Sequence, residues 1–498
     1  MSKITKSIAF LSLFILLPRV HAESILISEK SLNEISHRGA PGIDQIEAAF
    51  LNSSLKEGET SQKFSPELFG RSTYAETNER ALIEFQPVFT PIKQAQVGVR
   101  KNFKEGFDTS AYVVTDQRSA ENPFVGKLNN VTTTTLAFTA QIDLWKNLFG
   151  RMSKAELESA GLEKKRAEIE REIQLNTFKI SMRRIFWGLV ANNESALISE
   201  QLLQTAQRQV NEAKLRQKNA VAEADEVARY EAQLASREGT LLYLKYQKEN
   251  LTKQLRNLLP ELAGKEIELA RYDLSQTLTE VITCTATISQ EIQTPYQFTK
   301  YDEALSLLKQ IKTNNSIVNS RYSDAEIKLF GTVKSTGVGS ENVETKYVRG
   351  SFGSSITDQR EQNRTGYEVG VNFNLPLGDV KKNTQRVKEL YDEKRLAALI
   401  NSTDAQVVTT HQQLSRSIKL LTEVIRTQKV SSEQLSKRLK LMRRKYEQAR
   451  VSVDELVFDQ DALLNSELMT VETQLQILNT IFDYLVIYTE TPCAFNRI

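Results

Sequence analysis

The sequence predicts a mostly α-helical protein with a small β part, in which amphipathic strands run directly into very long helices. Residues 364–376 alternate between apolar and polar side chains and end at Pro376, which is the period-two pattern of a strand with one wet face. Residues 380–491 then contain neither glycine nor proline, as expected for an uninterrupted helical region. A similar strand at 132–144 leads into a second long helical region, so the pattern indicates an internal duplication.

Residues 1–22 have the pattern of a secretory signal peptide. Lys3 and Lys6 precede the apolar run 8–17, and the small residue Ala22 follows it, the arrangement of a signal that is cleaved after Ala22. The apolar run is about half as long as the ~20 residues that a transmembrane helix needs. The mature chain is therefore expected to be exported, and to enter a membrane only as a β-barrel.

Composition argues against several classes of function. The net charge is +3 on 498 residues, and the chain has three histidines and two cysteines. This small net charge does not favour a nucleic-acid partner. So few histidines and cysteines argue against a histidine-rich metal site or a thiol relay. No clustered acid–base or nucleophile constellation stands out, so the sequence predicts neither an enzyme nor a cofactor or metal site.

The first repeat is predicted to cover 23–270. It should contain a short helix from Asp44, strands at about 94–115 and 132–144, and a helical hairpin at about 154–259. Ser153 followed by Glu156 has the spacing of a capping box at the start of the hairpin. A connector at 271–300 leads to the second repeat.

The second repeat is predicted to cover 301–490, followed by a tail at 491–498. Its elements are a helix at 301–318, strands at about 326–336 and 364–376, and a helical hairpin at about 379–489. Pro376 should end the last strand, Gly378 should allow the chain to turn, and Asp379 can cap the next helix. The chain then has four strands, fewer than the eight that a membrane barrel needs, so it must share a barrel with copies of itself, and a trimer would supply twelve.

The long helices carry narrow apolar seams. The seam residues are Leu203, Ala206, Val210 and Ala213 in the first repeat and Leu435, Leu439, Met442, Tyr446 and Ala449 in the second. Their steps of three and four are typical of coiled-coil packing. An ordinary coiled coil would explain these seams, but it predicts no signal peptide, no strands and no duplication.

The same order of elements occurs twice after a cleavable signal peptide. In this the chain resembles the outer-membrane efflux protein family, the TolC-like channels of Gram-negative bacteria. Several local segments carry the resemblance: YDEALSLLKQIKTNNSIVNSRY, VNFNLPLGD, IFWGLVANNESAL, ARVSVDELVFDQDALLNSEL and NAVAEADEVARYEAQLA. The chain departs from the family pattern at Ser316, where proline is usual, and at Phe458 and Asp459, which stand where the family has Asp-Ala.

The resemblance implies a trimeric, twelve-stranded β-barrel in the cell outer membrane, continued by a long α-helical barrel in the periplasm. It also implies that the connector at 271–300 lies in the equatorial region of the helical barrel. It implies an exit duct of a tripartite efflux pump or of a type I secretion system, without choosing between them. The implied partners are two further copies in a homotrimer, a periplasmic adaptor protein, an inner-membrane transporter and outer-membrane lipid. An alternative is a periplasmic coiled-coil adaptor, which would show one hairpin and a lipoyl-like domain.

The turns of both hairpins are acidic and are candidate sites. The second turn carries four acidic residues, Asp454, Glu455, Asp459 and Asp461, and the first turn carries three, Glu223, Asp225 and Glu226. In a trimer Glu455 and Asp459 would form rings at a periplasmic constriction and make it cation-selective, and Arg450 would pair with a carboxylate to hold the tip shut. Asp454 and Asp461 are interpreted as a solvated face, and the first-repeat residues as adaptor-facing or solvated.

Cys284 in the connector and Cys493 in the tail are the only cysteines. Export to the periplasm permits oxidation, so one intrachain disulfide is a candidate, with two free thiols as the alternative.

Overall fold

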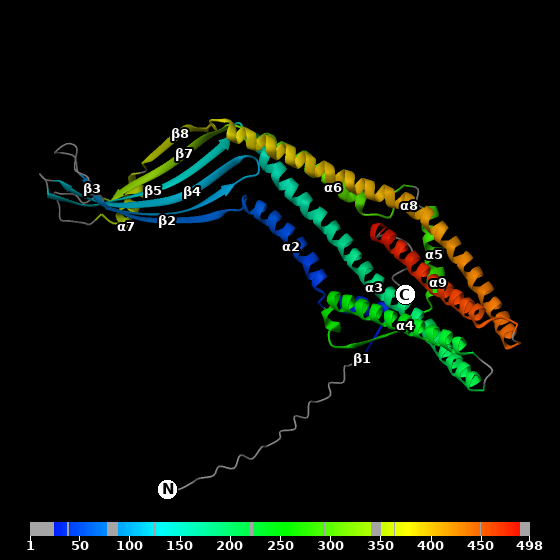
Figure 1. Cartoon of the computed structure of the whole chain (residues 1–498). Helices are drawn as coiled ribbons and strands as arrows, with labels where there is room; N and C mark the ends of the chain where they lie inside the picture. The colour runs from blue at the N-terminus through cyan, green and yellow to red at the C-terminus, as the bar shows by residue number, and fades with distance from the viewer. Residues whose placement is uncertain are drawn as a thin grey trace, which may run out of the picture. The chain divides into compact units, whose positions relative to one another are not determined.

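The structure, a computed structural model, describes residues 24–36, 39–76, 88–122, 126–219, 223–291, 294–339, 350–362, 364–448 and 450–488 (Figure 1). The predicted signal peptide, the tail and Cys493 lie outside these residues. The helices are α1 (Glu29–Ser36), α2 (Pro41–Gln62), α3 (Arg151–Lys218), α4 (Ala224–Leu258), α5 (Leu274–Glu291), α6 (Tyr301–Ser320), α7 (Phe352–Gln362), α8 (Asp379–Glu447) and α9 (Val453–Ile487).

The chain forms two compact units, and each takes segments from both predicted repeats. Unit 1 consists of residues up to Gln45, Gln174–Phe298 and the chain from Thr410, and unit 2 consists of Ile46–Ile173 and Thr299–Thr409. The repeats therefore interleave, with α2, α3 and α8 contributing to both units. Within the described ranges, no helix combines the length and the apolar character needed to cross a membrane.

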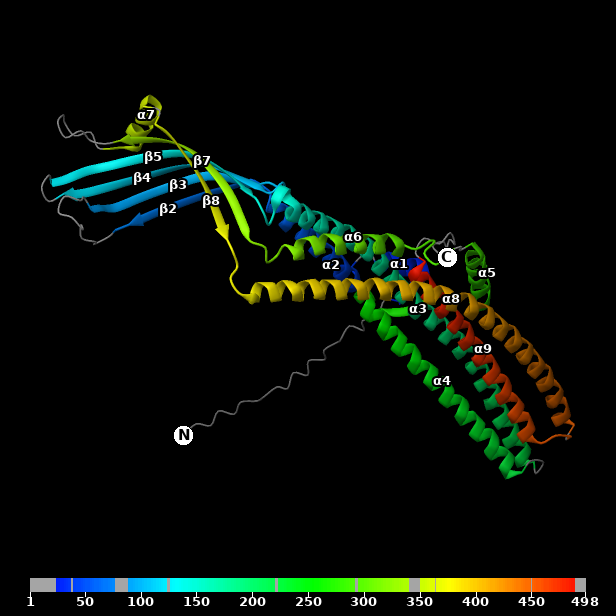
Figure 2. The same ribbon diagram turned by 90° about the horizontal axis from the view of Figure 1, so that it is seen from above.

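Unit 2 contains an antiparallel sheet in the order β2-β3-β4-β5-β7-β8, and Figures 1 and 2 show its strands side by side. The strands are β2 (Glu67–Ala75), β3 (Val88–Asn102), β4 (Phe107–Asn122), β5 (Gly126–Asp143), β7 (Glu326–Gly339) and β8 (Thr365–Asn374). The described sheet thus has six strands, and the predicted number of four is corrected.

Two features account for the additional strands. The predicted strand at 94–115 is a hairpin: the Phe103 N–H donates to the Phe107 carbonyl at 2.8 Å, and Gly106 has a φ of +86° that glycine adopts without steric cost. The hairpin turn fits tightly against the start of α3, where a Cβ on Gly150 would lie 1.8 Å from the Lys104 carbonyl oxygen. β2 was not predicted, because Gly70 and Ser72 interrupt its apolar alternation.

Helix α7 packs on β7 at the end of the sheet away from the long helices (Figure 2). Gly337 and Gly339 allow this contact, since a Cβ on Gly337 would lie 1.9 Å from the Ser355 carbonyl oxygen. The fully buried Ser355 hydroxyl lies 2.6 Å from that of Thr134 on β5. The chain between the last two strands is therefore partly helical.

Unit 1 is built around the middle of α3. Phe186 and Trp187 are fully buried, and the rings of both lie 5.3 Å from that of Tyr272. Next to them, Glu29 is buried at the start of α1, with its Oε1 2.5 Å from Arg183 Nε. Burial raises the pKa of Glu29, although Arg183 opposes this shift. A short strand, β1 (Ser24–Ile27), pairs in parallel with β6 (Glu266–Leu269) and joins the N-terminal segment to this core.

Candidate functional site

The first candidate feature is the unlike chemistry of the two faces of the sheet. The register places the exposed large apolar residues on one face: Leu68, Tyr74, Val97, Val99, Val113, Leu136, Phe138, Leu329, Val333, Tyr367, Val369, Val371 and Phe373. The other face is largely polar, with hydroxyl pairs such as Thr139 and Thr332, whose oxygens lie 2.9 Å apart. Glu368, Asn372 and Asn374 lie on this polar face, as the alternation predicts.

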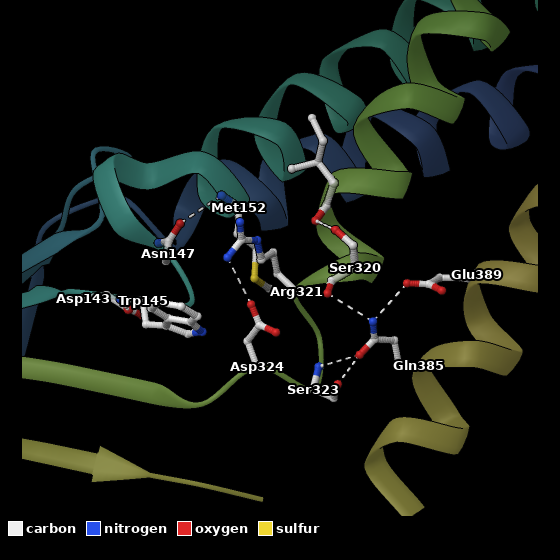
Figure 3. A network of polar contacts seen from close by, with 11 residues as sticks. Asp143, Trp145, Asn147, Met152, Ser320, Arg321, Ser323, Asp324, Gln385 and Glu389 are labelled. Atoms are coloured by element: carbon white, nitrogen blue, oxygen red, sulfur yellow. Dashed lines mark hydrogen bonds and ion pairs between the residues drawn. The ribbon is translucent and has the colours of Figure 1, made fainter.

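The second feature is the passage from strands to helices in unit 2, where Figure 3 shows a polar network. Asn147 Oδ1 accepts hydrogen bonds from the N–H groups of Met152 and Ser153, each at 3.0 Å. Asn147 thereby satisfies two of the donors that a helix start leaves free. The predicted capping box of Ser153 and Glu156 is wrong, because α3 begins at Arg151 and Ser153 already lies within its first turn.

A single glutamine connects α8 to the end of α6 in the same network. Gln385 Nε2 donates to the Ser320 carbonyl at 3.1 Å and to Glu389 at 3.0 Å. Its Oε1 accepts the Ser323 N–H at 3.2 Å (Figure 3). Between β8 and α8, Gly378 has a φ of +95°, so the residue predicted to allow the turn adopts a conformation that favours glycine. These contacts fix the direction in which α8 leaves the sheet.

The third feature is the tip of unit 1, where the adjoining ends of α3 and α4 lie beside those of α8 and α9 (Figures 1 and 2). The two hairpins share one apolar cluster there. Its members are Val210, Ala213, Val227, Tyr230 and Val453, with Leu234, Tyr446 and Val457 packed against them. Several of these are seam residues predicted from the helical periodicity. The shared cluster holds the two hairpins against each other.

Tyr446 forms the central polar contact of the tip. Its hydroxyl donates to Glu226 on α4, and burial raises the pKa of Tyr446. The Arg216 guanidinium lies 5.1 Å from the centre of the Tyr446 ring and 3.6 Å from Glu226 Oε1. Glu226 is therefore bound by a phenol and a guanidinium from two other helices.

Further contacts join the hairpins near this point. Arg229 pairs with Asp454 on α9 and with Asp225 in its own helix. Arg237 is 5% exposed and pairs with Asp461. Burial lowers the pKa of Arg237, and the charge of Asp461 opposes this shift. Asp454 and Asp461, interpreted from sequence as a solvated face, thus each pair with an arginine of the other hairpin.

The remaining predicted tip residues differ in environment. Glu455 is exposed in the first turn of α9, where its N–H donates to the capping Ser452. Asp459 is 1% exposed and accepts from Arg438 Nε at 2.9 Å. In this conformation its carboxylate is covered by its own chain, which does not fit a water-facing ring. Glu223 and Arg450 are exposed, and no ion pair to Arg450 occurs among the residues described.

The arginines and the tyrosine were missed as site residues by sequence reasoning. Tyr446 was identified only as a seam residue, and Arg216, Arg229 and Arg237 were not singled out. A signal was present, since a tyrosine on an apolar seam carries a hydroxyl that needs a partner.

Cys284 is disulfide-bonded, and no described cysteine is free. Because Cys493 lies outside the described residues, the pairing of Cys284 with Cys493 stays a prediction.

The fold matches solved outer-membrane channels over almost the whole chain. The outer membrane protein VceC of Vibrio cholerae superposes with a TM-score of 0.62 at 15% identity, over 92% of this chain and 95% of VceC. The CmeC outer membrane channel of Campylobacter jejuni gives 0.62 at 12% identity, over 98% and 94% of the two chains. The MtrE outer membrane channel of Neisseria gonorrhoeae, in its open state, gives 0.56 at 13% identity, over 92% and 88%.

No known family's profile matches the chain, and no curated protein matches it in sequence. The structural matches nevertheless show that the chain has the TolC-like fold, a long helical part joined to a small antiparallel sheet, which confirms the predicted fold class.

Proposed function

We propose that this chain is an outer-membrane channel that serves as the passive exit duct of a tripartite efflux pump or a type I secretion system. The observation that carries this proposal is the two-faced sheet, apolar and exposed on one side and polar on the other, within a TolC-like fold. An apolar outer face suits lipid, and a polar inner face suits a water-filled lumen. The chain would lie in the outer membrane and extend into the periplasm.

The height of the apolar face agrees with this placement. On β8 and just beyond it, exposed apolar residues recur from Tyr367 to Leu375. At ~3.3 Å per residue they cover ~26 Å along the strand, or ~21 Å along the normal for a strand tilted by ~36°. Transmembrane barrels have an apolar band of roughly 25 Å.

A single sheet with two open edges cannot enclose a lumen, so the channel needs further copies of the chain. The resemblance to TolC-like channels supports a homotrimer. It also supports the partners, a periplasmic adaptor and an inner-membrane transporter that supplies the work. The duct itself would catalyse no reaction.

The tip is the proposed gate and periplasmic entrance. Contacts between the hairpins hold this part of unit 1 together, and the exposed Glu455 would face the entrance in the proposed trimer. We expect Glu455→Gln to reduce cation selectivity and block by multivalent cations in planar bilayers, because it removes a carboxylate from each chain. Asp459→Asn should instead alter stability, since its carboxylate is buried. Unchanged selectivity in Glu455→Gln would remove Glu455 from the constriction.

Membrane fractionation tests the proposal as a whole. The protein should separate with outer membranes, run as a trimer in detergent and form ion-conducting pores in planar bilayers. A soluble or inner-membrane protein without conductance would refute the channel and favour the periplasmic adaptor.

A further inference from the structure

The apolar face of the sheet changes its chemistry towards the end that carries α7. On β5 and just beyond it, exposed apolar residues run from Leu136 to Leu144, beside the start of α3. At ~3.3 Å per residue they cover ~26 Å along the strand, as they do on β8. Beyond Leu136, the same face of β5 continues with Thr134 and Thr132. The apolar band therefore ends at Leu136, before the strand does.

The neighbouring strands change at the same level. The register defines three successive rows on this face: an apolar row of Gly70, Val97, Val113 and Leu136, a hydroxyl row of Ser72, Ala95, Thr115 and Thr134, and an outermost row of Tyr74, Lys93, Gln117 and Thr132. On β5 the two polar rows lie ~5 and ~11 Å beyond Leu136 along the membrane normal, for a strand tilted by ~36°. A bilayer core of ~30 Å becomes ~40–45 Å with its head groups, so these rows reach into and just past the head-group layer.

Helix α7 covers one part of the polar rows. Gly337, against which α7 packs, is the register partner of Thr134 and lies on the same face. The Thr132 hydroxyl donates to the Gly350 carbonyl, just before α7, at 2.9 Å. Thr132 and Thr134 are consequently buried, whereas Tyr74 and Lys93 of the same face are exposed. The helix thus shields β5 and β7 and leaves the polar rows of β2, β3 and β4 open.

The face is hollowed between α7 and β2. The hollow has a volume of ≈ 390 Å³, with Tyr74 on the side of β2 and Phe352 on the side of α7. Its floor includes Ser72, Lys93, Thr115 and Gln117. Three strand spacings separate β2 from β5, or ~14 Å. The hollow is therefore wide enough to receive a sugar head group rather than a single ion.

The floor offers one cation and two polar side chains that the chain itself does not use. Within the described ranges, Lys93 has no ion pair, and the side chains of Ser72 and Gln117 have no hydrogen bond. A nearby carboxylate, Glu76, is exposed and accepts a hydrogen bond from the Tyr74 hydroxyl at 3.0 Å. Lysine binds phosphate as a point charge, and hydroxyl and amide groups can both donate to and accept from sugar hydroxyls.

The exposed side of α7 extends the same chemistry. Phe352, Ile356 and Arg360 follow one another at intervals of four residues, so they lie on one side of the helix. All three are exposed. Apolar and aromatic residues combined with a basic residue are typical of a helix that lies in a membrane interface. In the proposed channel, α7 would thus lie among the head groups of the outer leaflet.

We propose that the hollow binds the phosphorylated sugar head group of an outer-leaflet glycolipid, with a phosphate on Lys93 and sugar hydroxyls on Ser72 and Gln117. Tyr74 and Phe352 would flank the sugar rings. This inference rests on the proposed outer-membrane channel and specifies a lipid that the channel binds.

The rest of the lipid fits the same face. Its acyl chains would follow the strands over the apolar row that contains Val97, Val113 and Leu136, all of them exposed. One molecule would then match both the polar rows and the apolar band below them. A phospholipid would satisfy Lys93 equally well, but it offers fewer hydroxyl groups to the polar floor, so the structure favours a glycolipid.

Titration with lipid A, a phosphorylated diglucosamine lipid, tests the site. Native mass spectrometry of the purified channel in detergent counts the bound molecules, and we expect one per chain. Lys93→Gln should bind lipid A about fivefold more weakly, the contribution of one lysine close to an anionic head group. The matched control is Lys101→Gln, on the same face of the same strand but eight residues nearer to the helices. It should bind as wild type.

Two further comparisons assign the contacts within the hollow. Dephosphorylated lipid A should bind more weakly than lipid A to the wild type but not to Lys93→Gln, because the variant has already lost the phosphate contact. Phe352→Ala should weaken binding of lipid A by removing one wall. Phe373→Ala, which removes an exposed ring from the helix-side end of the apolar face, should not.

The outcomes separate this inference from the proposed function. No binding of lipid A by the wild type, or equal binding by Lys93→Gln and Lys101→Gln, would overturn the site. Equal affinity of the wild type for lipid A and for phosphatidylglycerol would overturn its assignment to a glycolipid. Each of these results leaves the channel standing if the protein conducts ions and separates with outer membranes, whereas a soluble protein without conductance would refute the channel itself.

Discussion

Removal of the Tyr446 hydroxyl should loosen the tip without disturbing its packing. In Tyr446→Phe the ring stays in the apolar cluster and under the Arg216 guanidinium, which lies 5.1 Å from its centre. Only the hydrogen bond to Glu226 is lost. A hydrogen bond to a charged group contributes about 1.5–3 kcal/mol. Because Glu226 keeps Arg216 at 3.6 Å and is partly exposed, the lower end of this range applies, which corresponds to roughly a tenfold change in the ratio of closed to open tips.

Single-channel recording in planar bilayers measures this ratio. We expect the open fraction of the Tyr446→Phe channel to be roughly ten times that of the wild type, as long as both channels are mostly closed. The conductance of the open state should be unchanged, because the substitution does not touch the barrel. The matched control is Tyr246→Phe, which removes a hydroxyl from an exposed tyrosine on α4 in the same unit. It should behave as wild type.

A double-mutant cycle with Glu226→Gln then tests whether the two residues act on each other. The combined variant should open less than the sum of the single effects predicts, because Glu226→Gln weakens the hydrogen bond that Tyr446→Phe removes. Additive effects, or a Tyr446→Phe channel that gates like Tyr246→Phe, would refute the assignment of this contact as a closing interaction.

Three further results are expected. Asp461→Asn should lower the free energy of unfolding by about 1–2 kcal/mol because it leaves the buried Arg237 without a counter-charge, whereas Arg237→Met should change it by less than about 1 kcal/mol; chemical denaturation measures both. Burial raises the pKa of Glu29 above its ordinary 4.5, so stability should fall as pH rises from 4.5 through the raised pKa, and Glu29→Gln should flatten this dependence in thermal melts. Gly150→Ala should reduce the yield of folded trimer because of its φ of +74°, while Gly161→Ala, in open space on α3, should stabilise the protein by about 0.5–1 kcal/mol.

The long elements were predictable because their signals are strong and local. The alternation at 364–374 requires only a period of two, and β8 occupies nearly the same residues. The helical hairpins lack proline and carry apolar seams, so α3 and α8 extend over the regions predicted as helix. Both patterns can be recognised within a short stretch of sequence, and neither depends on a partner that is distant in the sequence.

The sheet margin was harder to predict for a physical reason. β2 has an exposed edge, and its polar and glycine residues resemble those of a loop. Its partner, β3, was recognised only where Val97 and Val99 alternate. The number of strands therefore depended on pairing across the hairpin, which a single-strand pattern does not contain.

The acidic tip was predictable, but the partners of its acids were not. Glu226 and Tyr446 are distant in sequence and meet only because the two hairpins pack together. Asp459 shows the same limit, since its position in an acidic run suggested water, whereas the helix turns it towards Arg438. Whether a helical carboxylate faces a partner or the solvent depends on which face the neighbouring helix covers.

The contacts at the tip differ in how much they can contribute to closure. Three contacts join the first hairpin to the second: Arg229 with Asp454, Glu226 with Tyr446, and Arg237 with Asp461. A change in the angle between the hairpins therefore strains all three together. Arg229 and Asp454 are both well exposed, and such pairs contribute about 0–1 kcal/mol and are screened by salt. In the pair of Arg237 with Asp461 the arginine is withdrawn from water, where an unpaired charge is costly, and in the pair of Glu226 with Tyr446 the carboxylate is only partly exposed. In the proposed gate, closure would therefore depend mainly on these two pairs and on the apolar cluster between them, rather than on the exposed acidic residues by which the sequence identifies the tip.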